Sequence, residues 1–119
     1  MKKILVVDDE EVIREGMRRI LSAEGYQVET SASGRSAIEK IQEHDFDVVI
    51  TDLKMENVSG MDILKEVNRL HPETRVIMLT AYATLDATIE AIRERIYDFF
   101  PKPVKIDELK KSVKKALGD

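Results

Sequence analysis

Several residue types that direct a chain toward particular kinds of protein are missing here. There is no cysteine, which excludes disulfides and thiolate chemistry. The N-terminus reads Met-Lys-Lys and runs through a short apolar segment into acidic residues, so it lacks the apolar core and cleavage site of a signal peptide. No apolar run approaches the roughly 20 residues of a membrane span. These absences favour a cytoplasmic location and no contact with the membrane.

Basic charge is also in short supply. The chain has 19 Lys and Arg against 23 Asp and Glu, a net charge of -4. Nucleic-acid binding needs a basic surface that displaces counterions from phosphates, so we expect no direct nucleic-acid binding by this domain. Four lysines near the C-terminus have the spacing of the solvated face of an amphipathic helix: Lys110, Lys111, Lys114 and Lys115.

What is present fits one folded unit. The chain has 119 residues, of which 43% are hydrophobic and 35% charged, a composition typical of globular proteins. This length is sufficient for one hydrophobic core, and the sequence contains no low-complexity segment or linker-like stretch. We therefore predict a single domain over residues 1–119.

Short apolar runs alternate with amphipathic stretches along the whole chain. Strands are predicted at residues 3–7, 27–31, 47–51, 75–79 and 97–100, and the apolar first, third and fourth are expected to be buried on both faces. Apolar residues three and four positions apart predict a helix after each strand. Ser33, Ser59 and Thr84 are expected N-caps, and Gly25 is expected to end the first helix.

This alternation predicts an α/β fold, because parallel strands joined by right-handed helical crossovers form a sheet covered on both faces. Five strands favour a doubly wound, flavodoxin-like (βα)5 sheet with the strand order 2-1-3-4-5. In such folds the ligand site lies beyond the carboxyl ends of the strands. The residues at those ends are therefore the candidates for function.

Polar side chains stand at four of the five strand ends. Asp8-Asp9 follow the first strand, Asp52 the third, Thr80 the fourth and Lys102 the fifth. The first and third strands are expected neighbours, so three carboxylates would share one pocket. Such a pocket either holds raised pKa values or binds a hard cation, and Mg²⁺ prefers this kind of oxygen ligand. A carboxylate beside Mg²⁺ can attack a phosphoryl group and form an aspartyl phosphate.

In this order and at these positions, the acid pair Asp8-Asp9, Asp52, Thr80 and the pair Lys102-Pro103 resemble the receiver domains of bacterial two-component response regulators. The resemblance spans essentially the whole chain. It implies that Asp52 is the phosphoacceptor and that Asp9 binds Mg²⁺ directly, with Asp8 in support. It also implies that the backbone carbonyl of Lys54 is a metal ligand and that Lys102 pairs with the phosphoryl group.

The same resemblance implies a signalling switch rather than an enzyme. Thr80 would turn to hydrogen-bond the phosphoryl group, and Phe99 would turn inward with it. The signal would reach the face formed by the fourth helix, the fifth strand and the fifth helix. That face would contact an output domain or form a homodimer, and a sensor histidine kinase or phosphotransfer protein would supply the phosphoryl group. Lys54 and Tyr82 fall where receivers tune autodephosphorylation.

The sequence departs from the family pattern at a few positions. Glu56 stands where many receivers have proline, which predicts a less rigid loop after the phosphoacceptor. Arg95-Ile96 replace the usual small residues, so Ile96 is expected to crowd the path of Phe99, which itself lacks the hydroxyl of a tyrosine. Lys54 and Tyr82, taken together with the segments Leu85-Asp86-Ala87 and Lys102-Pro103-Val104, resemble receivers of nitrogen-regulation-type, enhancer-binding regulators. This resemblance favours a chain that is part of a longer regulator, although the sequence leaves open whether the chain is complete.

Each signal also has a plainer interpretation. Asp8 and Asp9 could cap the first helix through its free N–H groups, and Thr80 and Lys102 taken singly are ordinary strand-end residues. His44 and His71 fall in expected loops without a metal-ligand partner, so neither is assigned a role. Phe99 and Phe100 are ordinary strand residues by pattern alone.

Other functions compete with the receiver hypothesis. A flavodoxin-like electron carrier would need a phosphate-cradling loop after the first strand, where this chain has two acids, and a P-loop protein would need a glycine-rich loop ending in Lys-Ser/Thr. A metal-dependent aspartyl phosphatase would add a substrate-selecting cap for which no residues are spare. An interaction module that works without phosphorylation remains the main alternative.

Overall fold

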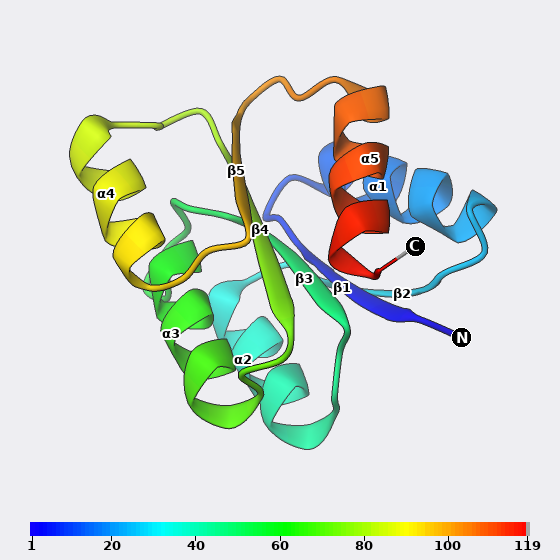
Figure 1. Cartoon of the computed structure of the whole chain (residues 1–119), viewed down its shortest axis with the longest axis horizontal. Coiled ribbons are helices and arrows are strands. Elements are labelled where there is room, and N and C mark those ends of the chain that lie inside the picture. Colours follow the sequence, from blue (N-terminus) through cyan, green and yellow to red (C-terminus); the bar gives the residue numbers. More distant parts are fainter. Residues whose placement is uncertain (119) are drawn as a thin grey trace.

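The computed structural model describes residues 1–118 (Figure 1), so the predicted domain range of 1–119 extends one residue beyond the described part. The strands are β1 (Lys3–Val7), β2 (Gln27–Ser31), β3 (Val48–Asp52), β4 (Arg75–Thr80) and β5 (Asp98–Pro101). The helices are α1 (Glu11–Ala23), α2 (Gly34–Glu43), α3 (Gly60–Leu70), α4 (Leu85–Arg93) and α5 (Ile106–Ala116).

All five strands are parallel and form one sheet in the order β2-β1-β3-β4-β5, which confirms the predicted doubly wound fold. Figure 1 shows α1 and α5 on one face of the sheet and α2, α3 and α4 on the other. The chain crosses from β1 back to the edge strand β2, and then through α2 to β3 on the opposite side of β1. The carboxyl ends of β1 and β3 therefore lie side by side at the point where the strand order reverses.

Alternation along the strands divides the core into two apolar clusters. In β1, Leu5 and Val7 pack against α2 and α3, whereas Ile4 and Val6 pack against α1 and α5. The apolar residues of β1, β3 and β4 are all at most 2% exposed, because helices cover both faces of these central strands. This burial supplies the main hydrophobic stabilisation of the sheet.

Three strands differ from the prediction by one residue at one or both ends. β3 covers residues 48–52 instead of 47–51, β4 ends at Thr80, and β5 covers residues 98–101 instead of 97–100. Asp52 pairs with Leu79 inside the β3–β4 ladder, and Thr80 pairs with Pro101. The candidate acceptor and the candidate switch residue are thus the last members of hydrogen-bonded strands, so their backbones are more rigid than loop residues would be.

The predicted helix ends are confirmed. The hydroxyl groups of Ser33, Ser59 and Thr84 each accept an N–H from the first turn of the helix that follows. Gly25 has a φ of 93° after α1, a left-handed conformation that favours glycine.

Two glycines allow close approaches that a Cβ would block. A Cβ on Gly60 would lie 2.1 Å from the carbonyl oxygen of Asp52, and one on Gly34 would lie 2.3 Å from the carbonyl oxygen of Val58. Since Gly60 also donates its N–H to the carbonyl of Leu53 at 2.8 Å, the start of α3 packs directly on the backbone of Asp52 and Leu53.

Substitution of these glycines tests the packing. We expect Gly60→Ala and Gly34→Ala to lower the free energy of unfolding by about 1–3 kcal/mol, because neighbouring backbone must move. Gly16→Ala is the matched control, because a Cβ there meets nothing within 4 Å, and it should raise stability by about 1 kcal/mol. Urea titrations followed by circular dichroism measure all three. A Gly60→Ala variant as stable as Gly16→Ala would contradict the close approach.

Candidate functional site

One lysine joins the two buried acids at the carboxyl edge of the sheet. The Nζ of Lys102 lies 2.8 Å from Oδ2 of Asp8 and 2.9 Å from Oδ2 of Asp52. Lys102 directly follows β5, and its backbone N–H donates to the carbonyl of Thr80 at 2.9 Å. The peptide bond between Lys102 and Pro103 is cis. Three strand ends, far apart in sequence, are thereby held at one point.

The electrostatics of this cluster are those of a partly desolvated ion pair. Asp8 is 1% exposed and Asp52 9%. Burial by itself would lower the pKa of Lys102, but hydrogen bonds and attraction from Asp8 and Asp52 outweigh it and raise that pKa above its ordinary value of 10.5. Lys102 therefore stays protonated and positively charged beside Asp52.

The carboxylate of Asp52 keeps a fixed orientation. Its Oδ2 accepts from Lys102 and its Oδ1 accepts from the backbone N–H of Lys54 at 3.2 Å. The close packing of Gly60 against the carbonyl oxygen of Asp52 restricts the backbone at this residue. One carboxylate with a cation on one oxygen and an exposed hollow in front of it is suited to act as a nucleophile toward phosphorus.

The acid pair on the β1–α1 turn divides into a buried and an exposed member. Asp8 is anchored by Lys102 and also accepts the N–H of Glu10 at 2.9 Å. Asp9 is exposed and its carboxylate has no hydrogen bond or ion pair within the described residues 1–118. The N-cap of α1 is Glu10, whose side chain makes no capping hydrogen bond. Neither Asp8 nor Asp9 occupies the N-cap position, and of the two only the Asp8 carboxylate, among residues 1–118, accepts an N–H at the start of this helix, that of the N-cap residue.

The donor set fits a hard cation. Ligand atoms of Asp8, Asp9 and Glu10 lie within 4.8 Å of one another, and carboxylate oxygens are what Mg²⁺ prefers. Asp52 does not belong to that group, but Asp9, Asp52 and Lys54 line one hollow together with Glu10 and Tyr82. The sequence prediction missed Glu10; its signal was the unbroken acidic run of residues 8–11.

Ala81 and Tyr82 also line the hollow, and Thr80 lies directly before them in the chain. Thr80 is fully buried, and its Oγ1 accepts the backbone N–H of Tyr82 at 2.9 Å. The ammonium of Lys54 lies 4.5 Å from the centre of the Tyr82 ring, so these two side chains meet across the mouth of the hollow in a cation–π contact. Phe99 is half-buried and packs with Ile96 against the core under α2 and α3.

The departures from the family pattern have visible structural counterparts. Arg95 has a φ of 60°, a left-handed conformation in which glycine costs least. Ile96 is packed against the same apolar cluster as Phe99, and the crowding of the path of Phe99 stays a prediction. Glu56 is exposed, and its carbonyl accepts the N–H of Val58 at 2.8 Å, so a tight turn follows the acceptor even without proline.

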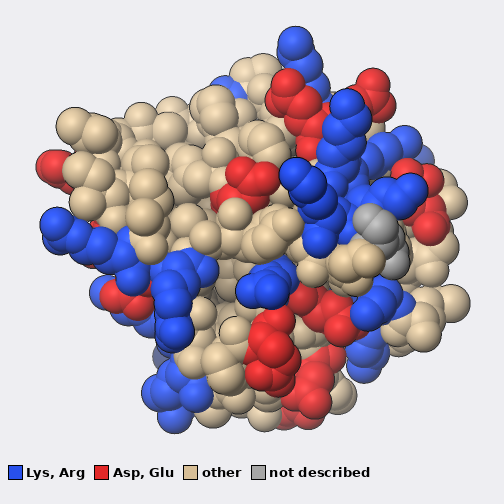
Figure 2. All heavy atoms as spheres, viewed as in Figure 1, with Lys and Arg blue, Asp and Glu red and all other residues tan. Residues whose placement is uncertain are grey.

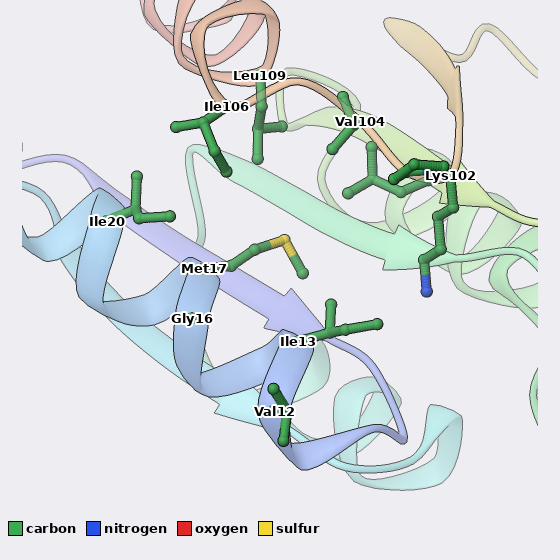
Figure 3. Close-up of a pocket in the computed structure, with 11 residues that line it drawn as sticks. Val12, Ile13, Gly16, Met17, Ile20, Lys102, Val104, Ile106 and Leu109 are labelled. Carbon is green, nitrogen blue, oxygen red and sulfur yellow. The ribbon is translucent and has the colours of Figure 1, made fainter.

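An apolar groove of about 560 Å³ adjoins the acidic hollow. Figure 3 shows Ile13, Met17 and Ile20 of α1 facing Ile106 and Leu109 of α5, with Lys102 at one end. The groove contributes no carboxylate or hydroxyl group. The chemistry of the site is therefore confined to the acidic hollow, and Lys102 separates it from this apolar surface.

Comparison with known proteins gives the family. A model of the response regulator receiver domain matches residues 4–114, nearly the whole described chain. The chain belongs to the response regulator receiver domain family. Such receiver domains are phosphorylation-dependent signalling domains of two-component systems, are generally not enzymes, and typically use Mg²⁺ at an acidic pocket. Within residues 1–118, no helix is long and apolar enough to cross a membrane.

Individual relatives agree with this assignment. The transcriptional regulatory protein ZraR of Escherichia coli (strain K12) is 36% identical over 115 residues, which cover 97% of this chain and 26% of ZraR. The DNA-binding transcriptional regulator NtrC of the same organism is 33% identical over 115 residues, 97% of this chain and 24% of NtrC. This receiver chain thus spans about a quarter of these relatives, and the predicted likeness to nitrogen-regulation-type regulators is confirmed.

A solved structure shows the same fold. The response regulator TrrA of Thermotoga maritima, solved in complex with Mg²⁺ and BeF, is 36% identical with a TM-score of 0.88, and the match covers 98% of this chain and all of that one.

The raised pKa of Lys102 predicts a pH dependence of stability. The folded receiver holds this proton more tightly than the unfolded chain, so the contribution is complete below pH 10.5 and is lost as the pH rises through the raised value. We expect the free energy of unfolding to fall more steeply above this pH in the wild type than in Lys102→Met. Denaturant titrations at several pH values measure it.

Lys110→Met is the matched control, because Lys110 has only a long contact with Glu24 at 3.9 Å. It should retain the alkaline loss of the wild type. Equal slopes for the wild type and Lys102→Met would show that the carboxylates do not hold the lysine proton.

Proposed function

We propose that this chain is a phosphorylatable signalling switch in which Asp52 accepts a phosphoryl group from a histidine kinase or phosphotransfer protein in the presence of Mg²⁺. The observation that carries the proposal is the bridge of Lys102 between Asp8 and Asp52. It keeps a cation fixed beside Asp52, a buried carboxylate that also faces an open hollow. In this proposal residues 1–119 form a single receiver domain.

In the proposed transfer, an Oδ of Asp52 attacks the phosphorus of a phosphohistidine and a new O–P bond forms. The P–N bond breaks, and its electron pair stays on the imidazole of the donor. Lys102 offers its ammonium to the phosphoryl oxygens, whose negative charge needs fixed donors. No residue of this chain has to supply or remove a proton at Asp52.

The metal would be held by Asp9, Asp52 and the backbone carbonyl of Lys54, with Asp8 in support. When bound, Mg²⁺ supplies charge neutralisation for the phosphoryl oxygens and for the clustered acids. The related TrrA was solved with Mg²⁺ and BeF, which supports a similar use of the site here. Lys54 and Tyr82 line the hollow and contact each other, and they would control the access of water to the acyl phosphate, and with it autodephosphorylation.

The switch would run through Thr80 and Phe99. If the Thr80 hydroxyl turns to the phosphoryl group, the hydrogen bond that it accepts from the backbone N–H of Tyr82 breaks. The loop before α4 then loses this attachment to β4. Phe99 would then move toward the space that Thr80 leaves. The packing of Ile96 against the same cluster would limit this movement.

The surface around α4 is suited to pass the signal on. Leu85 is 76% exposed and Ile92 65%, and Figure 2 shows few charges over α4 on the left of the view. Exposed apolar groups of this kind favour a protein contact. The proposed partners of the α4–β5–α5 face are an output domain or a second receiver, in a longer cytoplasmic regulator.

Two alternatives use the same fold. An interaction module that works without phosphorylation would bind its partners equally well with and without a phosphodonor. An aspartyl phosphatase would release inorganic phosphate from a substrate continuously instead of holding one phosphoryl group.

The acceptor is tested by intact mass after incubation with acetyl phosphate, with and without Mg²⁺. We expect one phosphoryl adduct that requires Mg²⁺ and is absent in Asp52→Asn, because the amide is a poor nucleophile. Asp47→Asn is the matched control, because Asp47 directly precedes the same strand at its other end and accepts the N–H of Lys3 at 2.8 Å. This variant should still take up one phosphoryl group. An adduct on Asp52→Asn at the wild-type level would show that Asp52 is not the phosphoacceptor.

A further inference from the structure

The orientation of Asp9 depends on its backbone. Asp9 is exposed, and its carboxylate has no partner within residues 1–118. In contrast, Asp8 is fixed by Lys102 and Glu10, and Asp52 by Lys102 and Lys54. The residue that is proposed to bind the metal most directly is therefore the one whose side chain is least constrained.

The two peptide groups that flank Asp9 are each held by one hydrogen bond. The peptide group after Asp9 is held because the N–H of Glu10 donates to Oδ1 of Asp8 at 2.9 Å. The peptide group before Asp9 is held because Nη1 of Arg14 donates to the carbonyl oxygen of Asp8 at 2.9 Å. The direction in which the Asp9 side chain leaves the turn is set by these two bonds together.

Arg14 is well placed to keep this turn fixed. It lies in the first turns of α1 and is half-buried, and its guanidinium makes no ion pair with a carboxylate of the described residues. Arg18, four residues further along α1, is instead paired with Glu15 at 2.6 Å. Arg14 therefore holds the β1–α1 turn by a hydrogen bond to the carbonyl oxygen of Asp8 and not by a salt bridge.

We propose that Arg14 is a positioning residue for the metal site, and that it acts by fixing the peptide group before Asp9. The proposal rests on the proposed function, because it assumes that Asp9 binds Mg²⁺. Electrostatics alone would give the opposite sign: removing a positive charge near a cation site strengthens cation binding. Weaker Mg²⁺ binding after loss of Arg14 is thus a signature of positioning.

The test is a double-mutant cycle on Mg²⁺ affinity, which needs no phosphodonor. Mg²⁺ is titrated into the wild type, Arg14→Met, Asp9→Asn and the double variant, followed by amide NMR signals of the β1–α1 turn. Salt at about 0.5 M screens distant charges. We expect Arg14→Met to weaken binding about tenfold and to have no further effect when Asp9→Asn is present. Arg18→Met removes the same charge from the same helix and should leave the affinity within about twofold.

A second measurement works without the metal. In metal-free protein, the amide of Glu10 should exchange with solvent faster in Arg14→Met than in Arg18→Met, because the turn is loosened. Arg14→Lys keeps a donor on a long stem and should restore much of the wild-type behaviour, which also covers the case of a poorly folded Arg14→Met.

The outcomes separate the two proposals. If Arg14→Met bound Mg²⁺ as tightly as Arg18→Met, or weakened Mg²⁺ binding equally with and without Asp9, the role of Arg14 would be overturned. The metal site itself would still stand. If Asp9→Asn by itself left Mg²⁺ affinity unchanged, the metal assignment of the proposed function would fail, and the role of Arg14 with it.

Discussion

The interaction on which the rest of this site depends is the ammonium of Lys102 between the carboxylates of Asp8 and Asp52. Two buried acids repel each other, but both are attracted to the ammonium that they share. The ends of β1, β3 and β5 are therefore held together. The same link leaves the carboxylate of Asp52 oriented and facing the hollow. The stability of the sheet edge and the proposed phosphoryl transfer at Asp52 therefore depend on the same interaction.

Asp52, the proposed acceptor, is held from two further directions. Gly60 brings the start of α3 against the Asp52 backbone, and the β3–β4 ladder includes Asp52 as its last member. Thr80 ends the neighbouring strand and is tied to the loop before α4 through the N–H of Tyr82. When the Asp52 side chain is modified, α3 and the β3–β4 ladder keep its backbone in place, whereas the hydrogen bond between Thr80 and Tyr82 can break. A switch needs this combination of one fixed part and one part that can move.

The fold and most site residues were predictable because their signals are local. Apolar strands, N-cap residues and acids at strand ends can be read from the sequence, and the reversal of strand order then brings Asp8 and Asp52 together. The contacts that orient them were not predictable. The bridge of Lys102 spans 94 residues to Asp8, and Arg14 reaches a backbone carbonyl that no side-chain pattern reveals. Strand ends shifted by one residue because pairing with neighbours sets them.

The central claim is that Asp52 carries the phosphoryl group, and chemical trapping tests it most directly. After phosphorylation with acetyl phosphate and Mg²⁺, borohydride reduces an acyl phosphate to the alcohol, and peptide mass spectrometry locates the altered residue. The account predicts a single aspartate-to-homoserine conversion at position 52. Conversion at Asp8 or Asp9, or a phosphoryl group on a hydroxyl or imidazole side chain, would contradict it.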